Sequence, residues 1–277
     1  MKRIGEIMPG IQDRIAQMQA TQRAWTEQVN ASVEANVHEC STHGTDITIN
    51  RRESVASSIK SGTLTLVWNR CQQCAADDAE QATRAMLEQA GVPPALVHAS
   101  FEGFVPANDS QQLAMKGAAT YAANPVGFFW LTGNPGTGKS HLAVSIMRVV
   151  SGTGIRVGFI EHNTLVNLYR DSYANLQGAR SEIRQWQNRG LLVLDDLGAT
   201  GMEARDATQI LHTLFAFRFG EKLPTVITTN LDKKGVRAAV GDRIKERFRE
   251  CFAGGVAIVG DSQRHNARQT YIREIGG

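Results

Sequence analysis

The sequence lacks the features that mark membrane and secreted proteins. No apolar run approaches the ~20 residues of a membrane-spanning helix. The N-terminal stretch MKRIGEIMPGIQDR has no apolar core of a secretory signal. Internal repeats and low-complexity segments are also missing. We therefore expect a soluble cytoplasmic protein that makes no membrane contact.

A strong excess of one charge is missing as well. The formal net charge of the 277 residues is +3 and the isoelectric point is about 8.7. This mild basicity is compatible with a nucleic-acid partner but does not establish one. The chain is 42% hydrophobic and 21% charged, as is usual for globular proteins. Its length allows one well-packed domain and a smaller module.

The stretch GNPGTGKS fits the phosphate-binding pattern G-x-x-x-x-G-K-[ST]. An apolar run of strand length precedes it, and apolar residues at helical spacing follow it. In this setting, backbone N–H groups and a helix N-terminus surround the phosphates of ATP or GTP. Lys139 is expected to reach the β- and γ-phosphates, and Ser140 to ligate Mg²⁺. The predicted nucleotide-binding residues are Gly133, Asn134, Pro135, Gly136, Thr137, Gly138, Lys139, Ser140 and His141.

A second acidic element stands in GLLVLDDLG, an apolar strand that ends in Asp195 and Asp196. Open α/β sheets bind ligands at the carboxyl ends of their strands. Asp195 is therefore predicted to hold Mg²⁺ together with Ser140, either directly or through water. Asp196 is predicted to orient or polarise the attacking water.

A third element, TVITTN, is an apolar strand that ends in Thr228, Thr229 and Asn230. A polar side chain there can hydrogen-bond the γ-phosphate or the water and so report which nucleotide is bound. Strands often end in such residues, so this element alone is weak evidence for a nucleotide site. It becomes persuasive because it follows the other two elements in sequence order.

Two arginines, Arg243 and Arg247, lie four residues apart in AAVGDRIKERFRE and share one face of a predicted helix. Arginine is suited to stabilising the charge on a transferring phosphate, from the same chain or from a neighbour. A solvated basic face is the alternative.

From residue 91 onward, strands and helices alternate, which is typical of a parallel sheet with crossover helices. The five predicted strands are FFWLT, IRVGFIE, GLLVLDDL, TVITTN and GVAIVG. Helices are predicted after Ser140 and over about residues 163–188, 204–219 and 240–251.

The N-terminal region predicts a helix and then a small module. Apolar residues recur at helical spacing from Ile11 to Val33 in a stripe too narrow to face a large core. The helix either binds a partner or a second copy of itself, or it packs on its own domain. TDITINRRE and GTLTLVW alternate as strands do, and a helix follows over residues 75–89. We therefore divide the chain into residues 1–38, 39–90 and 91–277.

The chain has only four cysteines, and two of them stand in C-x-x-C, which favours metal or redox chemistry over disulfides. Cys40 and His43 form one pair of potential ligands, and Cys71 and Cys74 form the other. Two such pairs make a tetrahedral Zn²⁺ site, and a bound metal stabilises a module too small to fold on its own core. His38 is an alternative ligand that is less well placed, a redox C-x-x-C is an alternative function, and Cys251 is expected to be an ordinary helix residue.

GNPGTGKSHLA, LLVLDDLG, LPTVITTNL and GDRIKERF, in this order, resemble the AAA+ ATPases of the DnaC/IstB type over residues 93–277. The resemblance implies an ATP site, with Asn230 as the sensor-one residue. It also implies that Arg247, or Arg243 as second candidate, acts as an arginine finger on a neighbouring subunit. ASFEGFV resembles the family's lead-in to the nucleotide pocket. ECSTHG and WNRCQQCA resemble the zinc-binding segment of phage and prophage DnaC-like loaders.

The chain departs from the common AAA+ pattern in two ways. Asp196 stands where most AAA+ proteins have Glu, although a pair of aspartates is common in this subfamily. Only 30 residues follow Arg247, too few for the usual helical lid with its sensor-two arginine. The resemblance thus implies a five-stranded P-loop domain with a reduced lid, slow hydrolysis and a switch-like use of ATP.

The expected function is the loading of a hexameric replicative DNA helicase onto single-stranded DNA in a bacterial or phage-infected cell. The N-terminal helix and zinc module would hold the helicase, and the ATPase domains would associate into an open ring or spiral. DNA contacts are expected from the long helical stretch that carries Arg170, Arg180 and Arg184, unless these line an ordinary exposed face.

Three alternatives are weighed against this function. The first is a transposition ATPase of the IstB type, which usually begins with a helical DNA-contact segment where this chain has the cysteine module. The second is a small-molecule kinase, which needs a basic lid and lacks the sensor strand and the arginine pair. The third is a zinc-dependent DNA-binding regulator, for which no recognition helix is apparent.

Overall fold

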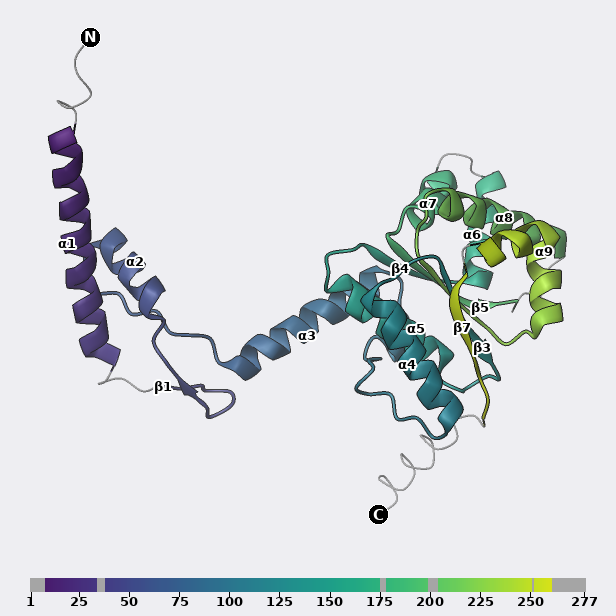
Figure 1. Cartoon of the computed structure of the whole chain (residues 1–277), viewed down its shortest axis with the longest axis horizontal. Coiled ribbons are helices and arrows are strands. Elements are labelled where there is room, and N and C mark those ends of the chain that lie inside the picture. The colour runs from purple at the N-terminus through teal and green to yellow at the C-terminus, as the bar shows by residue number, and fades with distance from the viewer. Residues whose placement is uncertain (1–7, 34–37, 175–177, 199–203, 251, 261–277) are drawn as a thin grey trace, which may run out of the picture. The chain divides into compact units, whose positions relative to one another are not determined.

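The computed structural model describes residues 8–33, 38–174, 178–198, 204–250 and 252–260 (Figure 1). The chain divides into two compact units, Met1–Ala82 and Thr83–Gly277. Within the described ranges, no helix is long and apolar enough to cross a membrane. The division into three parts at residues 38 and 90 stays a prediction.

The first unit begins with helix α1 (Met8–Val33), which confirms the predicted N-terminal helix. Helix α2 (Arg51–Ser61) packs against it (Figure 1). The buried side chains of Val29, Ile49 and Val55 form a small core with Trp25 and other half-buried apolar residues. The C-terminal half of α1 therefore packs on its own unit.

The N-terminal half of α1 leaves two apolar residues of the same stripe in solvent. Ile15 is 49% exposed and Met18 is 73% exposed. Partner binding by this half of the helix stays a prediction.

The strand predicted over TDITINRRE is wrong for its last three residues. A short antiparallel pair joins β1 (His38–Glu39) to β2 (Asp46–Ile47), and α2 begins at Arg51. Residues from Arg51 onward form a helix because the Asn50 side chain accepts the N–H of Glu53 as an N-cap. Gly62, at φ 70°, ends the helix.

The segment GTLTLVW is also not a regular strand. Only Trp68 forms an antiparallel bridge, to Ile49. The rest is held by α2, because the Ser54 hydroxyl exchanges hydrogen bonds with the backbone of Val67, and the Ser58 hydroxyl does so with Thr65. Two serines one helical turn apart thus replace a strand partner. Helix α3 (Gln72–Gln89) follows, as predicted.

The second unit contains a five-stranded parallel sheet in the order β4-β5-β6-β3-β7. The strands are β3 (Phe128–Gly133), β4 (Val157–Glu161), β5 (Leu191–Leu197), β6 (Thr225–Thr229) and β7 (Phe252–Ile258). All five predicted strands are confirmed. Because every strand runs in the same direction, their carboxyl ends meet at one edge.

Alternate side chains of these strands pack into two hydrophobic cores, one on each face of the sheet. Phe129 and Leu131 of β3 pack with helices α4 (Asp109–Ala123) and α5 (Lys139–Ser151) on one face. Phe128 and Trp130 pack with helices on the other face: α6 (His162–Ala174), α8 (Ala204–Gly220) and α9 (Lys233–Glu250). Figure 1 shows the sheet between these two layers. Leu87 and Ala90, near the end of α3, also belong to the first of these cores.

Three helices differ from the prediction. The single helix expected over residues 163–188 is two, α6 and α7 (Gly178–Gln187). Helix α9 begins at Lys233 instead of Val240 and is kinked at Gly241, whose φ of 75° suits only glycine. Helix α4 was not predicted, since its apolar face is mostly alanine and carries a weak periodic signal.

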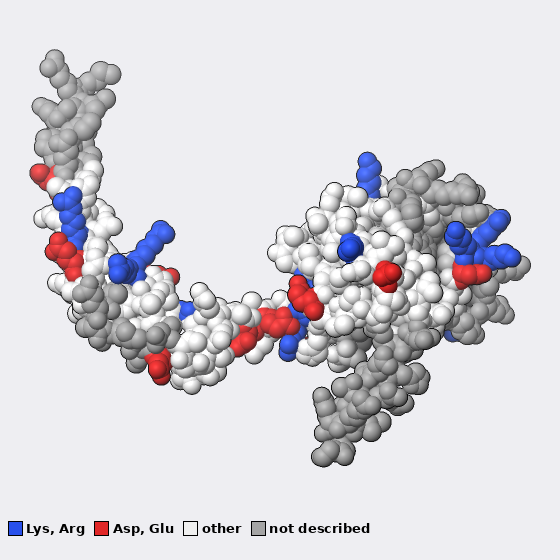
Figure 2. All heavy atoms as spheres, turned by 60° about the horizontal axis from the view of Figure 1, so that its bottom comes forward, with Lys and Arg blue, Asp and Glu red and all other residues white. Residues whose placement is uncertain are grey.

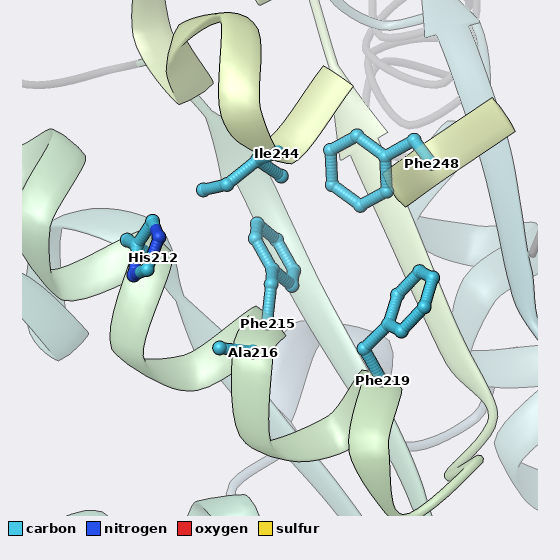
Figure 3. Close-up of a pocket in the computed structure, with 6 residues that line it drawn as sticks. All are labelled: His212, Phe215, Ala216, Phe219, Ile244 and Phe248. Atoms are coloured by element: carbon cyan, nitrogen blue, oxygen red, sulfur yellow. The ribbon is translucent and has the colours of Figure 1, made fainter. Parts of the chain in front are cut away.

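An aromatic cluster fixes the C-terminal half of α9 against α8. Figure 3 shows Ile244 and Phe248 of α9 facing Phe215 and Phe219 of α8. The rings of Phe215 and Phe248 meet edge to face, with centroids 5.0 Å apart. The part of α9 that contains Arg243 and Arg247 is therefore anchored on the sheet.

Candidate functional site

The loop between β3 and α5 has the conformation that a phosphate cradle needs. Gly136 and Gly138 have φ angles of 79° and 97°, which side chains disfavour. A Cβ atom at Gly138 would also lie 2.5 Å from the Phe104 ring. The loop leads directly into the N-terminus of α5, so backbone N–H groups and the helix dipole are available to an anion.

Lys139 links the loop to Asn230, which directly follows β6. Its buried Nζ donates to the carbonyl oxygens of Gly133 at 2.9 Å and Asn134 at 2.7 Å. It also donates to Oδ1 of Asn230 at 2.7 Å. Two residues that the sequence places 91 positions apart thus meet at the same point.

The predicted magnesium ligands also meet. The Ser140 hydroxyl donates to Asp195, 2.9 and 3.0 Å from its carboxylate oxygens. Thr228 Oγ1 donates to Oδ1 of Asp195 at 2.6 Å. Burial raises the pKa of Asp195 above its usual value, and the hydrogen bonds from Thr228 and Ser140 lower it in part. A hydroxyl beside a buried carboxylate is a donor set that suits Mg²⁺.

The Asp196 carboxylate has a different partner from that of Asp195, and the strand pairing is irregular between Leu194 and Leu197. The φ of Asp196 is 54°, an unusual value for a residue other than glycine. Its backbone N–H donates to Thr228 Oγ1 at 2.9 Å, and its Oδ1 accepts from Asn230 Nδ2 at 2.7 Å. The second aspartate therefore contacts the carboxyl end of β6 and Asn230.

One residue that supports this site, Gln111, was not predicted. The buried amide of Gln111, on α4, donates to the carbonyl of Thr137 in the loop at 3.3 Å. His141 Nε2 donates to the carbonyl of Ser100 at 2.8 Å, and its ring lies 5.3 Å from that of Phe104. The segment predicted as the lead-in, Ala99 to Val105, thus contacts the loop. Asn108, which caps α4 by accepting the Gln111 N–H, was the available sequence signal.

The structure describes only some of the side chains of the predicted arginines. Arg243 and Arg247 lie in α9, but their side chains are outside the described part of the structure. Arg170 on α6 and Arg184 on α7 are exposed, and the side chain of Arg180 is not described. Cys251 also lies outside the described residues.

The four predicted zinc ligands form one cluster. The potential ligand atoms of Cys40, His43, Cys71 and Cys74 all lie within 4.8 Å of one another. Nδ1 of His43 is 3.4–3.8 Å from the three sulfur atoms, and the sulfurs of Cys40 and Cys74 are 3.5 Å apart. A tetrahedral Zn²⁺ with ordinary bond lengths places such atoms about 3.5–3.8 Å apart, so the residues fit a zinc ion.

The surroundings favour deprotonated ligands at two of the cysteines. Backbone N–H groups of Thr42 and His43 lower the pKa of Cys40 to about 6. The Thr45 hydroxyl, 3.1 Å from the sulfur, lowers the pKa of Cys71. The neighbouring Cys40 raises the pKa of Cys74 to about 11, so the sulfurs share protons that a metal would displace.

The second ring nitrogen of His43 faces a carboxylate. Nε2 lies 3.2 Å from Oδ2 of Asp77, on the first turns of α3. Metal-binding histidines commonly donate their other N–H to such a group, which fixes the orientation of the ring. The adjacent Asp78 instead pairs with Arg70. His38 is in β1, and its side chain is not described.

The comparisons with known proteins agree with this geometry. The chain matches the family described as IstB-like ATP binding protein over residues 50–247. It is 26% identical over 205 residues to the replicative helicase loader DnaC of Escherichia coli (strain K12), covering 70% of this chain and 83% of that protein. It is 25% identical over 214 residues to the replicative helicase loader DnaC of Buchnera aphidicola subsp. Schizaphis graminum, covering 73% and 87%.

Solved structures agree on the fold. A crystal structure of the DnaC helicase loader superposes with a TM-score of 0.55 at 22% identity, covering 60% of this chain and 100% of that one. The replication initiator DnaA bound to AMPPCP and single-stranded DNA gives 0.52 at 18% identity, covering 64% and 55%. The predicted AAA+ fold is confirmed.

Proposed function

Because the chain belongs to the family of IstB-like ATP-binding proteins, AAA+ ATPases of the DnaC/IstB type, we propose that it loads a replicative helicase onto DNA. In this proposal it binds a hexameric helicase and places it on single-stranded DNA, with ATP binding and hydrolysis as the switch. Relatives named replicative helicase loader support the assignment.

The observation that carries the switch is a closed ring of hydrogen bonds. Lys139 donates to Asn230, whose amide donates to Asp196, whose backbone N–H donates to Thr228. Thr228 donates to Asp195, and Ser140, next to Lys139, closes the ring on the same carboxylate. A triphosphate competes with Asn230 for Lys139, so its arrival is registered directly at the sensor strand.

Each residue then has a defined task. The loop backbone, Lys139 and the N-terminus of α5 hold the phosphates, and Ser140 and Asp195 hold Mg²⁺. When bound, the ion neutralises charge on the phosphates. Asp196 orients the attacking water, and Asn230 distinguishes the triphosphate from the diphosphate. Arg247, or Arg243, serves the site of a neighbouring copy in an open ring or spiral.

The N-terminal unit is the proposed helicase contact. Ile15 and Met18 expose apolar surface on the N-terminal half of α1, and the zinc ion would hold the short loops of this unit in shape.

Single-stranded DNA is the proposed second partner. On the face shown in Figure 2, Lys and Arg are interspersed with Asp and Glu, and the described residues form no continuous basic surface there. Arg170, Arg180 and Arg184 remain the candidate contacts. Charge reversal at Arg170, Arg180 and Arg184 together should weaken DNA binding and lower its salt dependence. Unchanged salt-dependent binding would reject these residues.

The central test uses Lys139→Ala in the full chain, with Lys116→Ala, an exposed lysine of α4, as control. Lys139→Ala should abolish helicase loading on single-stranded DNA while leaving helicase binding largely intact, measured by co-purification with the host's replicative helicase. Absence of wild-type binding at micromolar concentration would overturn the proposed function. Equal loss of binding and loading in the variant would refute the separate tasks of the two units.

The family description also favours a second function, that of a helper ATPase in transposition. Such a protein assembles on duplex DNA and delivers a site to a transposase. ATP-dependent filaments on duplex DNA, without helicase binding, would establish this alternative over helicase loading.

A further inference from the structure

His162 is a buried histidine at the edge of the nucleotide site that none of the proposed steps uses. It follows β4 directly, begins α6 and is 1% exposed. Its Nδ1 accepts the backbone N–H of Gly198 at 3.2 Å. Gly198 stands just after β5, two residues beyond Asp196.

The backbone that follows Asp195 is held from both neighbouring strands. On the β6 side, Thr228 accepts the Asp196 N–H, and Thr229 Oγ1 donates to the Leu197 carbonyl at 2.7 Å. On the β4 side, His162 Nδ1 accepts a hydrogen bond from the Gly198 N–H. These three contacts enclose a β-bulge in which Asp196 has a left-handed conformation. Such a conformation persists only where its surroundings determine it.

Packing alone does not account for an imidazole at this position. Among the residues that the structure describes, nothing pairs with Nε2 of His162. A buried polar atom without a partner costs free energy, whereas an apolar ring would not incur this cost. The acceptor role requires the neutral ring with its proton on Nε2. Burial lowers the pKa of His162 to about 4, which keeps the ring neutral.

We propose that His162 is a positioning residue for ATP hydrolysis. By holding the Gly198 N–H, it keeps the bulge of β5 in the conformation that presents the Asp196 carboxylate to Asn230 and to the attacking water. This inference rests on the proposed ATPase function.

The experiment compares three variants of the full chain. His162→Phe fills the site without an acceptor, His162→Ala removes the acceptor without adding volume, and His162→Asn supplies an amide oxygen near the place of Nδ1. His98→Phe, at an exposed position, is the control. Nucleotide affinity is measured with a fluorescent ATP analogue, hydrolysis by single turnover with Mg²⁺, and protection of the Gly198 amide by hydrogen exchange.

Loss of the acceptor should lower the hydrolysis rate about 10- to 100-fold, the range expected for a displaced catalytic group. Nucleotide affinity should change less than about threefold, because Lys139 and the loop are untouched. His162→Asn should restore most of the rate. Gly198 exchange should accelerate in the Phe and Ala variants only.

Three results would overturn the inference. The first is an unchanged rate in the Phe and Ala variants, and the second is unchanged protection of the Gly198 amide. The third is an equal rate loss in all three variants, which is the pattern of a purely structural residue. Absence of hydrolysis in the wild type would instead overturn the proposed ATPase function, and this inference with it.

Discussion

The hydroxyl of Thr228 supports both aspartates, so Thr228→Val tests how the acidic strand end is held. Thr228 is buried, and valine has nearly the same shape, so the substitution removes hydrogen bonds without opening a cavity. It deletes the 2.6 Å donation to Asp195 and the 2.9 Å acceptance from the Asp196 N–H.

The size of the effect follows from the charge on Asp195. A hydrogen bond to a charged group contributes about 1.5–3 kcal/mol and a neutral one about 0.5–1.5 kcal/mol. Thr228→Val should therefore lower the free energy of unfolding by about 2–4.5 kcal/mol at neutral pH. The neighbouring Thr229 is an internal control, because it is equally buried and also makes two hydrogen bonds, both with neutral backbone groups of Leu197 and Leu231. Thr229→Val should cost about 1–3 kcal/mol.

The difference in unfolding free energy between Thr228→Val and Thr229→Val should depend on pH. The folded-state pKa of Asp195 is raised, so between its unfolded and folded pKa values the native state binds the extra proton. The contribution of Asp195 to stability is greatest below this window and falls as the pH rises through it. The Thr228 hydrogen bond lowers the pKa and limits that fall. Thr228→Val should therefore lose more stability at neutral than at acidic pH, whereas the loss in Thr229→Val stays constant.

The assay is urea unfolding of the metal-free and nucleotide-free protein at several pH values, with the pKa of Asp195 followed by carboxyl NMR. The pKa of Asp195 should rise further in Thr228→Val, because the hydrogen bond from Thr228 that lowers it is lost. Equal losses in the two variants at every pH would refute the reasoning.

Three further predictions concern the two sites. Elemental analysis should find one zinc ion per chain, and Cys40→Ser should remove the ion and lower the melting temperature of the N-terminal unit. Asp77→Asn should weaken zinc binding about tenfold in competition with a chelator, because it removes the carboxylate that orients His43. Asp78→Asn, on the same helix, should leave zinc affinity unchanged. Gly138→Ala should weaken ATP binding at least about tenfold by titration calorimetry, because its φ of 97° disfavours a side chain and the new methyl group meets the Phe104 ring.

The sequence predicted the parts of the protein that depend on strong periodicity or on a fixed motif. The five strands of the second unit are apolar runs between turn residues, and all five are confirmed. The strand–loop–helix around GNPGTGKS and the clustering of the four zinc ligands are also found where they were expected. These features are local in sequence, or follow from a parallel sheet that gathers its strand ends at one edge.

The errors lie where side-chain hydrogen bonds decide the structure. The segments TDITINRRE and GTLTLVW alternate as strands do, yet Asn50 caps a helix, and Ser54 and Ser58 bind the facing segment. The hydrophobic periodicity of a sequence does not reveal such side-chain hydrogen bonds. Arg218 is a second example, since it is fully buried and donates to the carbonyl oxygens of Gln187, Arg189 and Pro224 and to Thr225 Oγ1. Nothing around Arg218 in the sequence distinguishes it from an exposed helix residue.

The same distinction bears on the proposed switch at the nucleotide site. The strands are fixed by side chains such as Leu131, Leu194 and Ile227, which are fully buried and cannot shift without opening cavities. The hydrogen-bonded ring lies on the ends of those strands, where polar partners exchange without repacking a core. Asn230 belongs to the ring and leads within three residues into α9. Gly241 interrupts α9, and Ile244 and Phe248 anchor the part beyond it. A change at Asn230 should therefore move the first half of α9 while the arginine-bearing half stays on the sheet.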